Sequence, residues 1–300
     1  MPIAAAPKHP PKRLAYLGTP AFAVPTLRAL LAADFDVALV VSLRDARRGR
    51  GTRPSPTPVK SAASELGLAV TDRVDDVLSI DAELGVVVAY GRIIKPHVLE
   101  ALPLVNVHFS LLPRWRGAAP VERAILAGDE RTGVDLMVVD EGLDTGAIYD
   151  RAALDMGPDE TADELRARLA EAGTRLLLDN LRRGLPEPRP QVGEPTYADK
   201  IQPDELRIDW SRPAVEVHRL VRVGGAWTTF RGRRLKIWRT RLDVAQPGGG
   251  GPPETHDGLV VPTGEGWIRI VEMQPEGGQR MSARAWMNGV RWDGTEPLGR

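Results

Sequence analysis

The chain has 300 residues and no cysteine. Disulfide bonds, thiolate zinc sites and a cysteine nucleophile are therefore excluded. The sequence also lacks any apolar run near the roughly 20 residues that span a bilayer, so no membrane association is expected. The first twelve residues lack the apolar core of a secretory signal, and they predict a disordered tail over 1–12. A cytoplasmic location fits these absences.

Net charge is absent as well, because 40 Lys and Arg residues balance 40 Asp and Glu residues. That balance argues against a protein that coats nucleic acid generally. The basic residues are nevertheless concentrated. Five arginines oppose Asp45 between Arg44 and Arg53, and nine arginines with Lys236 oppose two acids over 207–241. This segregation predicts a polyanionic partner at two places. The alternative is that both stretches are only solvated surface.

Apolar runs and helically spaced apolar residues alternate through the first part of the chain. The buried strands expected are 13–18, 37–41, 84–90, 104–109 and 134–139, and the helices expected are 22–31, 59–66, 118–127 and 161–181. This alternation predicts an α/β fold, a Rossmann-like mainly parallel sheet with helices on both faces, over 13–185. No G-x-G-x-x-G follows the first strand, so a dinucleotide site has little support.

The pattern changes after about Gly184. Residues 186–206 contain several prolines and no periodicity, which is typical of a linker. Short strand-like runs then appear between Gly-Pro-rich turns, interrupted by one helix at about 214–223. The runs are 234–238, 259–261 and 267–271. They predict a smaller C-terminal β-barrel (OB-like) domain over 207–300.

Polar side chains occur at the end of the fourth predicted strand. Alternate side chains of a strand share a face, so Asn106 and His108 point one way and Val107 the other. Two polar side chains on a buried strand are costly unless they are used or satisfied, and open α/β sheets bind ligands at the carboxyl ends of their strands. Asp144 follows the next strand in a turn whose glycines allow it to fold back toward Asn106 and His108.

This residue set suits acyl transfer. An Asn amide donates to a developing oxyanion, a His moves a proton near neutral pH, and an Asp orients the His or favours its charged form. Two alternatives remain open, namely a hydrogen-bonded core His108 and an Asp144 that only shapes a turn. Ser110 lacks a nucleophile-elbow context, so a binding or structural role and a direct transfer are expected. His97, His108 and Asp144 have no recognised ligand spacing, so no metal is expected.

The longest recognisable motif is Asn106-Val-His-Phe-Ser-Leu-Leu-Pro-Arg-Trp-Arg-Gly-Ala-Ala-Pro120. With Leu143-Asp-Thr-Gly146, it closely resembles the folate-dependent formyltransferases. The resemblance extends through most of the chain and includes Tyr197-Ala-Asp-Lys200 and Ile208-Asp-Trp210 at the entry to the second domain. That second-domain segment, with a basic β-domain behind it, points to the member of the family that acts on tRNA.

The resemblance implies a donor, 10-formyltetrahydrofolate, and an acceptor, the α-amino group of methionyl initiator tRNA, in translation initiation. It implies that Asn106, His108 and Asp144 are catalytic. It also implies that the amine attacks the formyl carbon directly, through a tetrahedral intermediate. It also implies three segments that bind the folate. These are Ser110, Leu111, Leu112 and Pro113, then Val88, Ala89, Tyr90 and Gly91, and finally Asp140, Glu141 and Gly142.

The resemblance further assigns the basic stretches to tRNA phosphates, which arginine binds by forked hydrogen bonds. The residues implied are Arg44, Arg47, Arg48, Arg50, Arg53, Arg233, Arg234 and Lys236. The sequence departs from the family where Arg44-Asp-Ala-Arg-Arg48 replaces a Pro-Asp-Arg-Pro-type run, and where Gly224-Gly-Ala-Trp227 replaces an Asn-Pro-Trp-type turn. We expect a monomer. The alternatives are a sugar-nucleotide N-formyltransferase with the same donor, and a non-catalytic folate- or RNA-binding protein.

Overall fold

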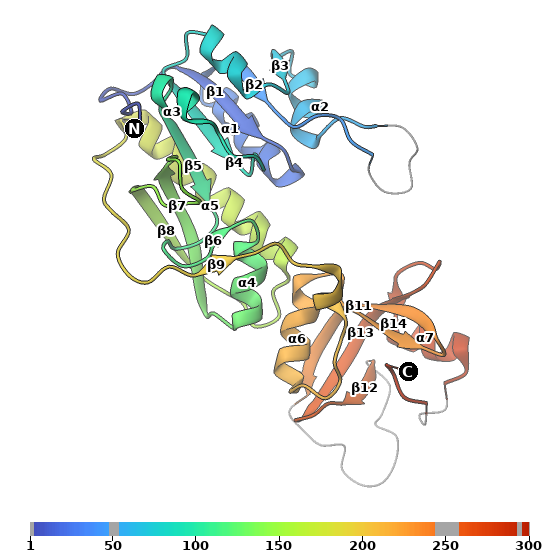
Figure 1. Cartoon of the computed structure of the whole chain (residues 1–300). Coiled ribbons are helices and arrows are strands. Elements are labelled where there is room, and N and C mark those ends of the chain that lie inside the picture. Colours follow the sequence, from blue (N-terminus) through green and yellow to red (C-terminus); the bar gives the residue numbers. More distant parts are fainter. Residues whose placement is uncertain (1–2, 48–53, 244–257, 293–295, 300) are drawn as a thin grey trace. The chain divides into compact units, whose positions relative to one another are not determined.

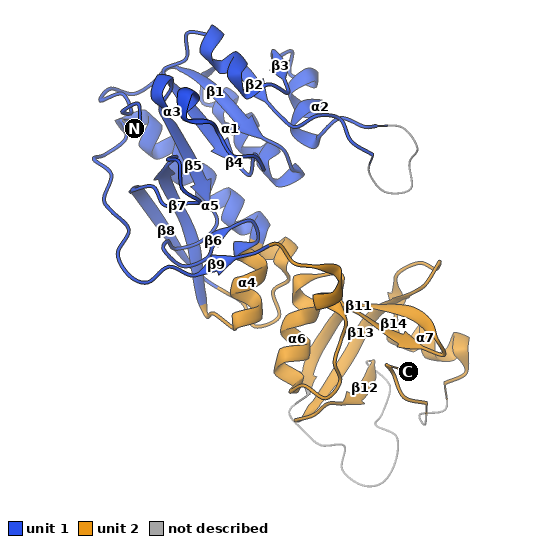
Figure 2. Cartoon of the chain, viewed as in Figure 1, with its two compact units in different colours: residues 1–120, 131–155, 166–199 blue, residues 121–130, 156–165, 200–300 orange. Residues whose placement is uncertain are grey.

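The computed structural model describes residues 3–47, 54–243, 258–292 and 296–299. The chain divides into two compact units (Figure 2). Unit 1 comprises residues 1–120, 131–155 and 166–199, and unit 2 comprises residues 121–130, 156–165 and 200–300. The predicted linker at 186–206 contributes short elements to both units, the strand β9 (Tyr197–Ala198) and the 3-10 helix η3 (Pro203–Leu206).

Unit 1 is built on a seven-stranded sheet with the order β3-β2-β1-β4-β5-β7-β8 (Figure 1). The strands from β3 to β5 run parallel. Strand β7 runs antiparallel to β5, and β8 pairs antiparallel with β7 and so runs in the direction of β5. The prediction of a mainly parallel α/β sheet is therefore confirmed. The edge strand β8 was not predicted, because its sequence IYDRAALD is half exposed and charged. The bounds are β1 Arg13–Gly18, β2 Asp36–Val41, β3 Val70–Thr71, β4 Leu84–Val88, β5 Leu104–His108, β7 Arg131–Val138 and β8 Ile148–Asp155.

Helices cover both faces of this sheet. On one face, the Tyr16 hydroxyl of β1 donates to the carbonyl of Ala23, just before helix α1, at 2.5 Å. Gly173 of helix α5 lies on the same face, so close to β5 that a Cβ there would come within 2.7 Å of Val107 Cγ1. On the other face, Val98 and other residues of α3 pack in an apolar cluster with β1, β2, β4 and β5. The helices are η1 Ala21–Ala23, α1 Val24–Ala32, α2 Pro58–Glu65, η2 Val74–Ser79, α3 Pro96–Ala101 and α5 Ala162–Arg183.

Unit 2 contains a curled antiparallel sheet of five strands in the order β10-β11-β13-β12, with β14 paired to β13 (Figure 1). The predicted small C-terminal β-domain is thus confirmed. Helices α6 and α7 pack against this sheet and contribute to its apolar core. In that core, the ring of Trp286 of α7 packs edge-on against the ring of Phe230, with 4.8 Å between the ring centres. Helix α7 was not predicted. The bounds are α4 Pro120–Ala127, α6 Ala214–Val223, β10 Trp227–Phe230, β11 Arg233–Asp243, β12 Leu259–Pro262, β13 Trp267–Pro275, β14 Met281–Ser282 and α7 Ala283–Val290.

Two buried side chains of α6 bind the segment 157–160 within unit 2. Arg222 donates to the carbonyls of Gly157 and Glu160, both at 2.8 Å. His218, only 3% exposed, has Nε2 at 3.1 Å from the Pro158 carbonyl and Nδ1 at 2.9 Å from the Thr240 hydroxyl. The apolar face of α6 packs on the sheet, while these two polar side chains bond backbone carbonyls of the segment 157–160.

Candidate active site

Strand β5 presents Asn106 and His108 on the same face of the sheet, as alternation predicts. The register pairs Asn106 with Val87 of β4, and pairs His108 with Asp135 of β7. Val107 points to the opposite face, toward α5. His108 is 6% exposed and Asn106 is half-buried. The two candidate catalytic side chains therefore lie side by side on the face that does not carry α5.

The His108 ring lies between two acceptors. Its Nε2 is 3.0 Å from the carbonyl oxygen of Trp115, and because a carbonyl only accepts, Nε2 carries a proton. Its Nδ1 is 3.7 Å from Asp144 Oδ2. That is an ion-pair separation rather than a hydrogen bond. Nδ1 thus has a carboxylate nearby and makes no close hydrogen bond to the described residues.

The loop after β7 carries Asp144 to this face. Because β7 is antiparallel to β5, its end lies beside the start of β5, and the loop must fold back across the sheet. Asp144 adopts a left-handed conformation with φ 52°. Its Oδ1 is 3.5 Å from the Asn106 amide nitrogen, and its Oδ2 accepts from the Gly117 backbone N–H at 2.9 Å. The structure therefore brings Asn106, His108 and Asp144 together.

The turn that carries Asp144 is tight on both sides. A Cβ on Gly146 would lie 1.9 Å from the Val138 carbonyl oxygen, so only glycine fits there. Asp140 begins the turn, and its Oδ1 accepts from Gly142 N at 3.1 Å and from the Thr145 hydroxyl at 2.7 Å. These bonds leave Glu141 and Gly142 exposed. The predicted folate residues Asp140 to Gly142 thus form the outer part of the turn that carries Asp144.

The other predicted folate segments adjoin the same strands. Val88 ends β4 and is buried, and Ala89 follows with φ 49°. Burial raises the pKa of the Tyr90 phenol, and the Tyr90 carbonyl accepts from the Thr19 hydroxyl at 2.8 Å. Ala89, Trp115 and Asp144 are all non-glycine residues with positive φ. Such conformations are costly and cluster where a site constrains the backbone.

The segment Ser110–Pro113 is held by an ion pair between a buried carboxylate and a partly exposed arginine, which the sequence did not reveal. Asp135 is fully buried and accepts from Leu112 N at 2.8 Å. Arg151 donates to Asp135 and to the Leu112 carbonyl, at 2.8 and 3.0 Å. Burial raises the pKa of the Asp135 carboxyl, although Arg151 opposes the shift. Ser110 donates to the Arg114 carbonyl at 2.6 Å, so its hydroxyl shapes the loop.

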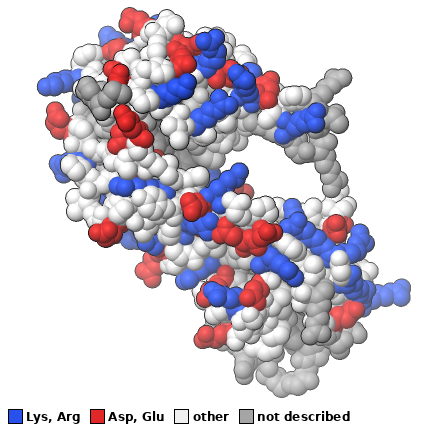
Figure 3. All heavy atoms as spheres, viewed as in Figure 1, with Lys and Arg blue, Asp and Glu red and all other residues white. Residues whose placement is uncertain are grey.

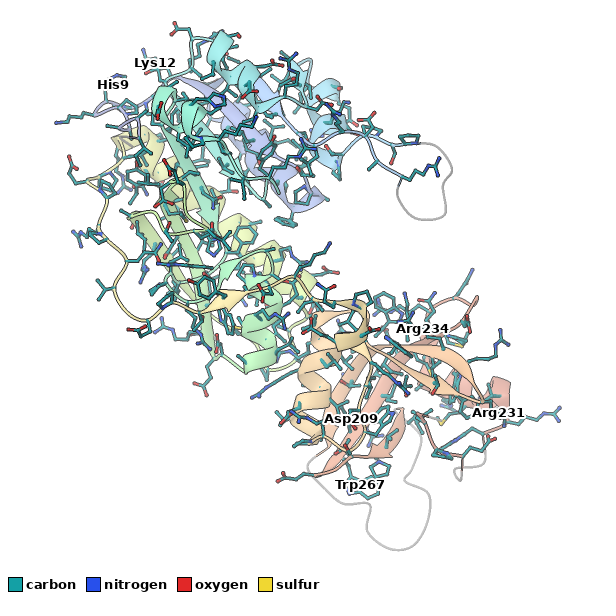
Figure 4. All side chains as sticks on the ribbon, in the orientation of Figure 1. His9, Lys12, Asp209, Arg231, Arg234 and Trp267 are labelled. Atoms are coloured by element: carbon teal, nitrogen blue, oxygen red, sulfur yellow. The ribbon has the colours of Figure 1, made fainter. Side chains whose placement is uncertain are left out.

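The predicted tRNA-binding residues divide into two groups. Arg44 is exposed and bonds Asp72 at 3.1 Å, and Arg47 is exposed. Arg48, Arg50 and Arg53 lie outside the described residues. Arg233, Arg234 and Lys236 are exposed along β11 of unit 2. Figure 3 shows Lys and Arg interspersed with acids on the visible face, and Figure 4 labels Arg234 and Arg231 near the β10–β11 turn.

Aromatic side chains accompany the cations of β11. The Arg234 guanidinium lies 4.0 Å from the centre of the Trp227 ring, and Arg207 approaches the same ring at 5.7 Å. Lys236 and Arg280 lie 5.9 and 5.2 Å from the Trp238 ring. This group of basic and aromatic side chains belongs entirely to unit 2. The sequence had indicated its charge but not its stacking.

Two absences hold for the part of the chain that the structure describes. No helix there is long and apolar enough to cross a membrane. In the same ranges, no three or more His, Asp or Glu side chains are grouped so that they could hold a metal ion.

Comparison with known proteins gives the family. Residues 12–181 match the formyl transferase family, and residues 200–291 match the formyl transferase C-terminal domain. A methionyl-tRNA formyltransferase from Dinoroseobacter shibae is 44% identical over 295 residues, which are 93% of this chain and 97% of that protein. The chain belongs to the methionyl-tRNA formyltransferase family. The family predicted from the motifs is therefore confirmed. The prediction that the protein is an enzyme of this family is confirmed as well.

Solved structures support the fold. A methionyl-tRNA formyltransferase from Clostridium thermocellum superposes with a TM-score of 0.57 at 19% identity, covering 78% of this chain and 95% of that one. An N-formyltransferase from Helicobacter canadensis, solved with folinic acid and dTDP-3-aminofucose, superposes with a TM-score of 0.66 at 20% identity. That match covers 86% of this chain and 98% of the other.

Proposed function

We propose that this chain transfers the formyl group of 10-formyltetrahydrofolate to the α-amino group of methionyl initiator tRNA. The attack is direct and forms a tetrahedral intermediate, with no covalent enzyme species and no metal. The observation that carries the proposal is the cluster of Asn106, His108 and Asp144 on one face of the sheet. The relatives at 40–44% identity that carry the methionyl-tRNA formyltransferase name support the choice of acceptor.

The surroundings of His108 support its role in handling charge. Nε2 donates to Trp115 O, whereas Nδ1 lies 3.7 Å from Asp144 Oδ2 and makes no close hydrogen bond to the described residues, so a protonated Nδ1 can donate to the substrate. When the amine attacks the formyl carbon, negative charge develops on the formyl oxygen, and donors held in place before the reaction stabilise that charge. His108 serves in this way, and the proton leaving the amine passes to N10 of the folate, directly or through water.

Asn106 is the second donor. Its amide nitrogen approaches Asp144 Oδ1 only at 3.5 Å, a long contact, so the group is oriented without being strongly bound. An amide nitrogen has two hydrogens, which allows one to face Asp144 and the other to face the oxyanion. Asp144 itself is anchored by Gly117 N. Its carboxylate is thereby held beside Nδ1 of His108.

The folate is proposed to bind against Val88–Gly91, Ser110–Pro113 and Asp140–Gly142. These three segments adjoin β4, β5 and the Asp144 turn, which is the edge where the catalytic side chains lie. Ala89 and Gly91 are exposed residues, and their backbone amide and carbonyl groups are proposed to bind the pterin ring. The structural neighbour from Helicobacter canadensis was solved with folinic acid, which supports a folate-type donor for this chain.

The tRNA is proposed to bind through the cations of β11 and of the 44–53 loop. Arginine pairs with phosphate through two parallel hydrogen bonds, and indole rings provide stacking surfaces for bases. Arg234 over Trp227 and Lys236 beside Trp238 combine both features on unit 2. We place the protein in the cytoplasm, where translation supplies this substrate, and we propose that it acts as a monomer.

A single assay tests the proposal. The purified chain receives 10-formyltetrahydrofolate together with methionyl-tRNA or, in parallel, dTDP-3-aminofucose. We expect formylmethionyl-tRNA and unmodified sugar. Formylation of the sugar alone would identify a sugar-nucleotide N-formyltransferase. Binding of folate or RNA with no product would identify a non-catalytic protein. Either result contradicts the proposed function.

A further inference from the structure

The segment 189–198, which we call the strap, lies in the stretch that the sequence predicts to be a featureless linker. It belongs to unit 1 and is hydrogen-bonded to the rest of that unit near both of its ends. Arg189 exchanges two backbone hydrogen bonds with Ile148, both at 2.8 Å. Tyr197 and Ala198 form β9, which pairs in parallel with β6 (Arg116–Gly117). The strap therefore lies against the loops that surround the catalytic side chains.

Gln191 of the strap connects two of these loops. Its amide Nε2 donates to the carbonyls of Asp144 and Gly146, at 2.8 and 2.9 Å. Its Oε1 accepts from Arg116 Nε and Nη2, at 3.1 and 2.6 Å. Gln191 is half-buried. One side chain thus bonds both sides of the Asp144 turn and the residue next to Gly117, whose N–H holds the Asp144 carboxylate.

The chemistry of these partners requires an amide. Two carbonyls need donors and a guanidinium needs an acceptor, so the network fixes which end of the amide is nitrogen. Glutamate has the same shape, but it would set a carboxylate oxygen against the two carbonyls. Methionine fills the volume and offers neither group. Among the standard side chains of this length, glutamine meets all four contacts.

The strap also holds the other neighbour of His108. The Thr196 hydroxyl accepts from Trp115 N at 2.9 Å, and Arg116 N donates to the Thr196 carbonyl at 2.9 Å. The Trp115 carbonyl in turn accepts from His108 Nε2. The strap therefore bonds the residues that provide both groups beside the His108 ring, which are the Asp144 carboxylate and the Trp115 carbonyl.

We propose that Gln191 is a positioning residue for formyl transfer, which acts by fixing the turn that carries Asp144. The inference rests on the proposed function for its kinetic consequence. Asp144 has a left-handed backbone, which is costly for a non-glycine residue and persists only when its surroundings impose it. Loss of the two Gln191 donors releases that turn and lets the carboxylate move away from His108. Since displacements of about 1 Å in a site cost up to about 100-fold in rate, a substantial kinetic effect is expected.

The kinetic test compares Gln191→Met, Gln191→Glu and the neighbouring control Val192→Ala, whose side chain is 87% exposed. We expect Gln191→Met to lower kcat about tenfold, with KM for folate and tRNA and the Tm close to those of Val192→Ala. Gln191→Glu keeps an acceptor for Arg116 but not the donors, so it should be at least as impaired. A fully active Gln191→Glu would assign the residue to Arg116 alone and overturn the proposal.

A double-mutant cycle tests the route of action. If Gln191 works through Asp144, then Gln191→Met changes kcat by less than about twofold in an Asp144→Asn background, because the two losses are not additive. A full tenfold loss in that background would overturn the inference. If wild-type protein formylates no tRNA, the proposed function fails. The inference is then still decided by ring ¹⁵N NMR, in which Gln191→Met should shift the His108 signals and leave those of His218 in place. Unshifted His108 signals would overturn it.

Discussion

Two buried histidines, one in each unit, differ in the chemistry of their neighbours. His218 of unit 2 has the Thr240 hydroxyl at Nδ1, and it has both the Pro158 carbonyl and Asp159 Oδ1 at Nε2. A hydroxyl can donate, so the neutral ring has both nitrogens satisfied. His108 of unit 1 has only acceptors, the Trp115 carbonyl and the Asp144 carboxylate, and the latter is beyond hydrogen-bonding distance. The first arrangement suits a structural residue, and the second leaves Nδ1 available for chemistry.

The largest expected effect separates the two rings by activity. His108→Ala should lower kcat/KM for formyl transfer by at least about 100-fold, because it removes a proton-handling group and an oxyanion donor. The protein should remain folded, with a smaller loss of Tm than in His218→Ala, because His108 makes one close hydrogen bond to the described residues and His218 makes two. Steady-state kinetics and thermal unfolding measure both quantities, with His218→Ala as the matched variant. Wild-type turnover in His108→Ala would remove this ring from the mechanism.

The second effect separates the two carboxylates beside these rings. Asp144→Asn keeps an acceptor for Gly117 N but removes the charge, and we expect kcat to fall about 100-fold. Asp159 is the matched control, because its exposed carboxylate lies 3.1 Å from His218 Nε2. Asp159→Asn should keep kcat within about twofold. Equal kcat values for the two variants would contradict the expectation that Asp144 serves catalysis and Asp159 does not.

A third variant tests the structural role of His218. His218→Ala leaves the Thr240 hydroxyl and the Pro158 carbonyl without their buried partner, which costs about 2–4 kcal/mol. Urea unfolding measures this loss in the free energy of unfolding. Activity measured well below the Tm should remain. If kcat falls as far as in His108→Ala, then the chemistry of the neighbouring groups does not distinguish a structural histidine from a catalytic one.

The pH dependence of stability sharpens the same point. Burial lowers the pKa of His218 below its ordinary value of 6.5. As pH falls below about 6.5, the unfolded chain gains a proton on this ring before the folded chain does, so stability is lost toward acid at up to about 1.4 kcal/mol per pH unit. Urea midpoints at pH 7.5 and 5.5 measure the loss. His218→Gln should reduce the difference between the two pH values, and an unchanged difference would place its origin elsewhere.

The smallest expected effect lies in binding by unit 2. Arg234→Ala should raise KM for methionyl-tRNA about fivefold, leave kcat unchanged, and reduce the salt dependence of binding by roughly one phosphate contact. Arg175→Ala is the control, because Arg175 is an exposed α5 residue that forms an ion pair with Glu171 of the same helix. A drop in kcat with KM unchanged would mean that Arg234 serves the chemistry of transfer and not the binding of tRNA.

Much of this arrangement was predictable from the sequence. Period-two alternation placed Asn106 and His108 on one face, and the family motifs supplied Asp144. The fold class followed from alternating strands and helices. These features are local, or are repeated in a motif, so short stretches of sequence carry them. The antiparallel direction of β7 could not be predicted, because a buried strand is a run of apolar residues whether it pairs in parallel or antiparallel with its neighbour.

The residues that support the site were not predictable. Asp135 and Arg151 are ordinary charges in the sequence, and they become an ion pair, with Asp135 buried, only when β7 and β8 pair. Gln191 stands among prolines and glycines with no periodicity. Its role depends on contacts with residues more than 40 positions away in the chain. Such contacts leave no trace in local patterning.

The strap has a consequence for dividing this enzyme into parts. A fragment ending at 185, where the composition changes, would retain Asn106, His108 and Asp144. It would lack Gln191 and Thr196, which hold the neighbours of His108. A fragment extended to Asp199 keeps both residues, as the boundary of unit 1 does. For anyone grafting a new acceptor-binding module onto this catalytic unit, the joint therefore belongs after the strap.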